Sequence, residues 1–110
     1  MDYIDIYKSY TADYYKQIGI TYKRTRRRQI VLSMAAMMNA MQHKMGPTDI
    51  GRIFNVNHST VLYHHKHHES KMIYQDYRSL FQVAVEKINE AAITIGNAKN
   101  AIHMLSGESE

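Results

Sequence analysis

The sequence predicts an all-α fold, a small bundle of about five helices that contains a helix-turn-helix. Eight methionines in 110 residues and few runs of valine or threonine favour helices over strands. Apolar residues recur at spacings of three and four, which is the helical period. With one proline and five glycines, little of the chain is suited to loops, and its length is that of a single ordinary domain.

The N-terminal half is expected to contain two amphipathic helices joined by a basic loop. The first helix lies within residues 1–19 and ends near Gly19, the loop covers 20–27, and the second helix runs from about 26 to 42. The apolar stripes expected in the core are Ile6, Tyr7, Tyr10, Tyr14 and Ile18 in the first helix, and Ile30, Met34, Met37, Met38 and Met41 in the second.

Two short helices are expected next. Gly46-Pro47 breaks the second helix and starts a third at about 47–54. A fourth helix, at about 58–70, takes Asn57 or Asn55 as its N-cap. The side chains of this fourth helix expected to face the core are Val61, Leu62 and His65.

A longer helical segment, residues 74–105, is expected to complete the domain, which spans 1–105. Gly96-Asn97 is a candidate end or kink within this segment. Residues 106–110 are expected to form a flexible polar tail.

The strongest functional feature is the helix-turn-helix at 47–70. Gly51 allows its two helices to approach closely, and Val56 is the apolar plug of the turn. Short polar side chains at the start of the second helix can reach base edges in the major groove of DNA. The face expected to stay exposed carries Asn57, His58, Ser59, Tyr63 and Lys66. A plain helical hairpin with an asparagine cap is the structural alternative.

Positive charge is concentrated just before the second helix. The formal net charge is +4, and five of the fourteen Lys and Arg residues fall within six positions: Lys23, Arg24, Arg26, Arg27 and Arg28. Such a cluster on a small helical domain indicates a polyanionic partner, most often nucleic acid. A solvated loop without a partner is the alternative.

Four short segments, in order along the chain, follow the motifs of a known family. They are Ala12-Asp13-Tyr14-Tyr15, Lys23-Arg24-Thr25-Arg26-Arg27-Arg28-Gln29-Ile30, Asp49-Ile50-Gly51-Arg52-Ile53-Phe54 and Asn57-His58-Ser59-Thr60-Val61-Leu62. From about Tyr10 to Ile88 the chain resembles the C-terminal duplex-DNA-binding domain of the bacterial replication initiator DnaA. The corresponding family patterns are A-E-Y-Y, a basic loop before R-Q-hydrophobic, E-I-G-x-x-F and D-H-T-T-V-hydrophobic.

The resemblance implies roles for individual residues. Asn57, His58 and Ser59 would contact bases in the major groove, and Lys23 or Arg24 would enter the adjacent minor groove. The resemblance assigns phosphate contacts to Arg28, Gln29 and Thr60. The basic run and the exposed helix face add Arg26, Arg27, Tyr63, Lys66 and His67 as expected phosphate contacts.

The chain departs from the family pattern in three places. Asn55-Val56 replaces G-G-R before the signature, which shortens the turn by one residue, and the basic loop is also shorter. The shorter turn is typical of helix-turn-helix modules in general, so the resemblance extends to that wider superfamily. Asn57 replaces the signature aspartate, and because asparagine pairs well with adenine, we expect a different DNA site.

Several function classes lack their motifs. No G-x-x-x-x-G-K-[ST] loop and no cysteine occur, and no catalytic constellation stands at a recognisable spacing. We therefore expect neither an enzyme nor a nucleotide or cofactor site. The longest apolar runs are too short to cross a membrane, and no signal peptide starts the chain. A cytoplasmic protein is expected, associated with the nucleoid or, if encoded by a virus or plasmid, in the host cytoplasm.

The histidine cluster His64-His65-Lys66-His67-His68 has two interpretations. Pairs three or four apart on a helix can share a metal ion. Alternatively, His65 and His68 pack inside while His64 and His67 lie near phosphates and gain charge on protonation. The second interpretation predicts that DNA affinity rises as the pH falls from 7.5 to 6.

The sequence therefore favours a sequence-specific duplex-DNA-binding protein that regulates transcription or assists at a replication origin. The alternative is a protein-interaction adaptor whose helix-turn-helix no longer binds DNA. A second copy of the chain is a further candidate partner, since two half-sites bind more tightly than one. The apolar surface expected to serve it consists of Ala91, Ala92, Ile93, Thr94, Ile95, Ile102, Met104 and Leu105.

Overall fold

The protein is an all-α bundle, as the sequence predicts. The computed structural model describes residues 3–19 and 27–105, with side chains up to residue 97, and contains helices but no strands in this part of the chain. The helices are α1 (Tyr3–Ile18), α2 (Arg27–Ala40), α3 (Pro47–Phe54), α4 (His58–Lys66), α5 (His68–Lys71) and α6 (Gln75–Leu105).

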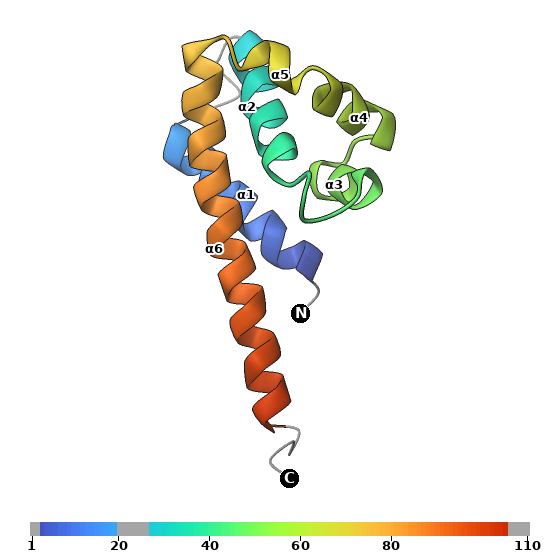
Figure 1. Ribbon diagram of the computed structural model, residues 1–110, viewed down its shortest axis with the longest axis vertical. Helices are drawn as coiled ribbons and strands as arrows, with labels where there is room; N and C mark the ends of the chain where they lie inside the picture. Colours follow the sequence, from blue (N-terminus) through green and yellow to red (C-terminus); the bar gives the residue numbers. More distant parts are fainter. Residues whose placement is uncertain (1–2, 20–26, 106–110) are drawn as a thin grey trace.

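The helices form two groups around α2. Helices α1 and α2 both pack against the long α6, and α4 packs on α2 from the other side, next to α3 (Figure 1). Helix α1 also reaches α3, where the Tyr3 hydroxyl donates a hydrogen bond of 2.6 Å to Asp49. The α3–α4 pair is therefore held at the edge of the bundle, with one side against α1 and α2.

The core contains most of the apolar residues expected in α1 and α2, although Ile30 is only half-buried and belongs to neither core cluster. The largest fully buried side chains include Tyr14, Tyr77, Met37, Met38, Met41, Ile50, Ile88 and Val61. The Tyr14 hydroxyl donates to the carbonyl oxygen of Ser33 at 2.8 Å, so the buried ring has a partner for its polar atom. Among the described residues, no buried side-chain nitrogen or oxygen lacks a hydrogen-bond partner.

Two expectations for the fourth helix are wrong. The helix does not run to residue 70, because His67 leaves the helical dihedral range (φ −96°, ψ 6°) and separates α4 from α5. Leu62 does not face the core but is 48% exposed, whereas His64 is only 4% exposed. The inward face follows Val61 and His64, three residues apart, and this register turns Leu62 outward.

Helix α6 continues through Gly96-Asn97 without a break to Leu105, so neither residue ends it. A glycine inside a helix costs about 1 kcal/mol relative to alanine, which a helix of 31 residues tolerates. No helix in the described residues is long and apolar enough to span a membrane.

The apolar stretch assigned to a second copy packs largely within the chain. Ala91 is fully buried, Ile95 packs against the core, and Thr94 shares a hydrogen bond of 2.7 Å with Tyr10. Only Ile93, at 63% exposure, is a large apolar side chain on the surface among residues 91–95. The side chains of Ile102, Met104 and Leu105 lie outside the described ones. Binding of a second copy stays a prediction.

Gly51 sets the distance between α3 and the turn that follows it. A Cβ atom at this position would lie 2.6 Å from the carbonyl oxygen of Val56, a distance that side chains essentially never adopt. Because the obstacle is backbone, it cannot move aside without displacing the turn. Glycine is required here for close packing, as the sequence predicts.

We predict that Gly51→Ala destabilises the fold by about 1–3 kcal/mol, the usual cost of forcing an extra group into a packed site. Gly96→Ala is the matched control, since nothing lies within 4 Å of its added Cβ. The control should stabilise α6 by about 0.5–1 kcal/mol. Urea denaturation followed by circular dichroism measures both, and equal effects of the two substitutions would contradict the close approach at Gly51.

Candidate nucleic-acid interface

The turn between α3 and α4 is tight and hydrogen-bonded. Asn55 adopts the left-handed conformation (φ 57°, ψ 47°), which asparagine tolerates better than most residues. The Val56 amide then donates to the carbonyl oxygen of Gly51 at 2.9 Å. Asn57 is the N-cap of α4, and its side-chain oxygen accepts from the Ser59 amide at 3.1 Å. Both asparagines are explained by local backbone chemistry.

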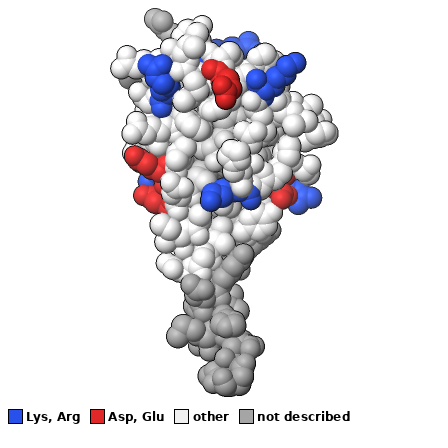
Figure 2. Space-filling model, in the orientation of Figure 1, with Lys and Arg blue, Asp and Glu red and all other residues white. Residues whose placement is uncertain are grey.

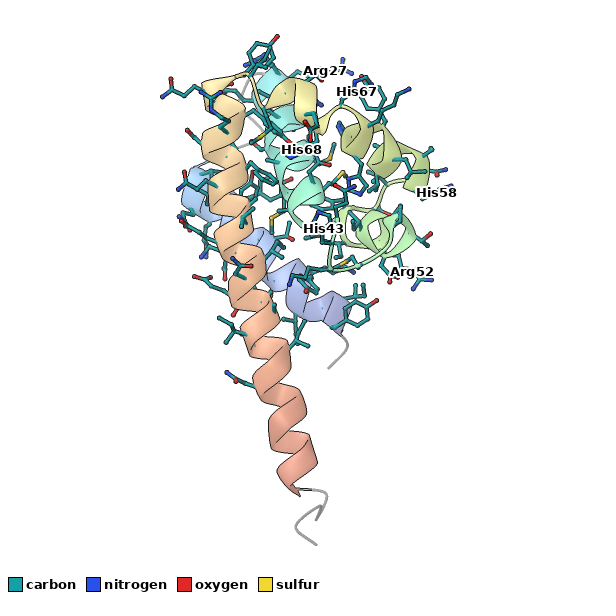
Figure 3. The ribbon with its side chains drawn as sticks, viewed as in Figure 1. Arg27, His43, Arg52, His58, His67 and His68 are labelled. Carbon is teal, nitrogen blue, oxygen red and sulfur yellow. The ribbon has the colours of Figure 1, made fainter. Side chains whose placement is uncertain are left out.

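The start of α4 is exposed and polar. Asn57, His58 and Ser59 are all exposed, as the sequence predicts, and Thr60 is half-buried. Further along the helix, Leu62 and Lys66 follow His58 at intervals of four, so these three residues share one face. In Figure 3, His58 lies on the outer edge of the molecule, on the side away from α6.

The cap limits what Asn57 can recognise. Its Oδ1 atom already accepts from the Ser59 amide and lies 3.3 Å from the Ser59 hydroxyl, which also donates to it. Only the Nδ2 donor is left for an external partner. To pair with adenine, Asn57 would have to use both Oδ1 and Nδ2, and Oδ1 would have to leave the cap. The arrangement therefore favours a single hydrogen bond from Nδ2 to a base acceptor.

Behind α4, one buried asparagine joins three elements. Asn39 of α2 is 3% exposed, and its Nδ2 donates to the carbonyl oxygen of His64 at 3.1 Å and to the Tyr77 hydroxyl at 2.8 Å. Its Oδ1 lies 2.7 Å from Nδ1 of His65. On α4, Asn39 bonds to the carbonyl oxygen of His64 and to the inward-facing ring of His65. These hydrogen bonds therefore hold α4 in place and leave its exposed face free.

The hydrogen-bond chemistry gives the network a direction. Asn39 Oδ1 is an acceptor, so His65 donates from Nδ1. The Tyr77 hydroxyl accepts from Asn39 and lies 2.8 Å from Nδ1 of His68. The neutral tautomer of His68 with its proton on Nε2 can accept from this hydroxyl at Nδ1. A second proton on the ring would remove that acceptor.

Burial keeps these histidines neutral at physiological pH. Desolvation is the main cause that lowers the pKa of His64 to about 4, and the positive charge of Lys71 lowers it further. The pKa values of His65 and His68 are also lowered, again mainly by burial. His65 and His68 are half-buried and hydrogen-bonded to Asn39 and Tyr77, so the expectation that they are partly buried packing residues is confirmed.

The expected role of His64 is wrong. The sequence places it near phosphates, but it is buried, because it follows Val61 on the inward face of α4. His67 is half-buried, with its ring centroid 4.4 Å from that of Tyr63. Among the described residues, no group of three His, Cys, Asp or Glu side chains is placed to hold a metal ion.

The predicted basic residues are distributed over different surroundings. Arg27 and Arg28 begin α2 and line a groove beside Tyr63 of α4. Gln29 instead lines a separate hollow with Gln17 and Asp76, so it does not lie beside α4. The remaining basic residues of the cluster, Lys23, Arg24 and Arg26, lie outside the described residues.

Arg28 already has intramolecular partners. Its guanidinium lies 2.6 Å from the carboxylate of Asp76 and 5.5 Å from the centre of the Tyr74 ring. The hydrogen bond from Arg28 is the main reason why the pKa of Asp76 is lowered. Since both side chains are about half exposed, the pair adds little stability and can be exchanged for an external anion.

Three further residues adjoin this surface that the sequence did not single out. Arg52 lines a hollow with Thr48 and His58 at the α3–α4 turn, while Lys71 and Tyr74 line the groove with Arg27. The place of Arg52 could have been found from the sequence, because it lies four residues after Thr48 and so shares a face of α3 with it. The positions of Lys71 and Tyr74 could not have been found from the sequence, because they depend on the break between α4 and α5 at His67.

Charge on the visible face is mixed. In Figure 2, Lys and Arg residues alternate with Asp and Glu, without one continuous basic patch. Arg27, His67, His58 and Arg52 instead follow the outer edge of the molecule in the same view (Figure 3). This edge runs along α4 and the start of α2.

Comparison with the models of known protein families, with curated proteins and with solved structures finds no match to this chain. The similarity to the DNA-binding domain of the replication initiator DnaA thus depends on the four sequence motifs, and it stays a prediction.

We predict that stability falls as the solution is acidified from pH 6.5 toward pH 4. His64 has a lowered pKa in the folded chain, so the unfolded chain takes up a proton in this range that the folded chain does not. The contribution of His64 to the free energy of unfolding is fully present above the pKa that His64 has in the unfolded chain. Its loss at lower pH amounts to at most about 3 kcal/mol. Urea midpoints at pH 7.5, 6 and 5 measure it.

His64→Gln should flatten this pH dependence, because it removes the buried imidazole and keeps a polar side chain. His58→Gln is the control, since it removes an exposed imidazole from the same helix. An unchanged slope in His64→Gln would contradict the assignment.

Proposed function

We propose that this protein binds duplex DNA, with α3 and α4 acting as a helix-turn-helix and the start of α4 entering the major groove. The observation that carries the proposal is the asymmetry of α4. Its inward face is fixed by Val61, His64 and the Asn39 hydrogen bonds, while the polar residues of its first turn are exposed. A helix presented in this way fits the width of the major groove.

The edge along α4 carries the charge that a DNA backbone requires. Lys66 is exposed on α4, and Arg27 begins α2 beside Tyr63. Cations on either side of a recognition helix can neutralise phosphates and release counterions, which makes affinity depend on salt. His58 and Ser59 supply short polar side chains for base edges, and Leu62 provides an apolar contact for a thymine methyl group.

The second candidate is a protein-interaction adaptor, and the exposed Leu62 favours it. This side chain is 48% exposed next to Tyr63, which is 57% exposed. Two neighbouring large side chains on one helix can anchor a protein partner. The two proposals differ in what the cations do, because only DNA binding requires them to meet phosphates.

We predict that the wild-type chain selects a sequence from random duplexes and that His58→Ala/Ser59→Ala loses this preference. The double variant should retain weak, salt-dependent binding, because its phosphate contacts remain. Losing one or two base contacts costs about 1–3 kcal/mol each in discrimination. Fluorescence anisotropy with the selected and a scrambled duplex at stated salt measures the ratio.

Gln82→Ala is the control, since Gln82 is also an exposed polar residue and lies on α6, away from α4. It should leave both affinity and preference unchanged. If the wild-type chain binds no duplex at low ionic strength, the DNA proposal is wrong. Binding of a protein partner that Leu62→Ala abolishes would then support the adaptor.

A further inference from the structure

A groove of about 520 Å³ lies between the start of α2, α4, the end of α5 and Tyr74. Its lining combines three cations with two aromatic rings: Arg27, Arg28, Lys71, Tyr63 and Tyr74. The groove adjoins the outer edge of α4, since Tyr63 belongs to both. It contains no acidic lining residue, which distinguishes it from the hollow that includes Asp76.

Within residues 3–19 and 27–97, Lys71 is a cation without an anionic partner. Its ammonium lies 3.5 Å from Nδ1 of His64 and 5.9 Å from the centre of the Tyr63 ring. Among the described residues, no ion pair joins it to a carboxylate. Burial lowers its pKa, so an approaching anion would stabilise the charged form. His64 cannot share the positive charge at neutral pH, since its own pKa is lowered to about 4.

Arg28 shows the opposite situation. It has an anion within the chain, because the Asp76 carboxylate lies 2.6 Å from its guanidinium. A phosphate entering the groove would have to compete with this carboxylate. Asp76 therefore weakens whatever contribution Arg28 makes to binding an external anion.

We propose that this groove binds a backbone phosphate of the duplex, with Lys71 and Arg27 as its cations and Asp76 as a competitor for Arg28. The inference rests on the proposed function and extends it to a contact beyond the recognition helix. The phosphate lies between Tyr63 and Tyr74, which form the walls of the groove. Lys71, which is half-buried, gains an anionic partner when the phosphate binds.

The test uses the full-length chain and its selected duplex, with anisotropy measured at several salt concentrations. Lys71→Gln should weaken binding roughly fivefold to tenfold at 0.1 M salt and reduce the salt slope by about 0.9, the value for one lost phosphate contact. Lys71→Arg should keep the slope of the wild type. Lys71→Gln removes no ion pair within the described residues, and the glutamine amide can still donate to Nδ1 of His64, so the thermal midpoint should change little.

Asp76→Asn should strengthen binding, and the gain should disappear when Arg28→Ala is present in the same chain. Lys44→Gln is the matched control: it removes one exposed charge beyond the opposite end of α2, about 20 Å of helix away. It should change affinity less than Lys71→Gln and leave the slope within error of the wild type.

The outcomes separate the two proposals. A wild-type chain that binds no duplex overturns both. A wild-type chain that binds, with Lys71→Gln showing the same affinity and salt slope, overturns the groove while leaving the recognition helix in place. A gain from Asp76→Asn that persists with Arg28→Ala shows only a general charge effect and overturns the role of Asp76.

Discussion

The hydrogen bonds of Asn39 determine where α4 lies. This one amide joins α2 to the His64 carbonyl and His65 side chain of α4 and to the Tyr77 hydroxyl of α6. Since Asn39 is buried, a loss of any partner would leave a polar group unsatisfied, which costs about 1–3 kcal/mol. The orientation of α4, and with it the direction of His58 and Ser59, follows from this contact.

The same contact explains why α4 has two different faces. The inward face uses Val61 and His64, so the outward face is available for binding without any cost to the core. Gly51 completes the arrangement, because its missing Cβ lets the turn approach α3. The fold thus supplies a fixed helix with a free N-terminal turn, while the cations of α2 and Lys71 lie along its outer edge.

Much of the fold could be predicted from residue patterns, because helical periodicity and the Gly-Pro and Asn-cap signals are local. The turn at 55–57, the buried methionines of α2 and the exposure of His58 all follow from such signals. Leu62 and His64 could not be placed correctly, since a rotation of less than one turn exchanges their environments. Tertiary contacts fix that rotation, namely the burial of Val61 and the hydrogen bonds that Asn39 makes to α4.

The candidate site was predictable only in part for the same reason. Arg28 belongs to a basic run in the sequence, yet its carboxylate partner Asp76 lies 48 positions away. Lys71 gave no sequence signal, because its position depends on the break at His67. Local patterns identify candidate ligands of DNA, whereas the pairing of charges is decided by the packed structure.

The central claim is that α4 meets DNA with its first turn. Titration of the isotope-labelled chain with its selected duplex, followed by amide chemical shifts, tests this most directly. The account predicts that the largest shifts fall on residues 57–60 and 63, with the outer face of α6 unaffected. Shifts concentrated on α1 and α6, with residues 57–60 unchanged at saturation, would contradict it.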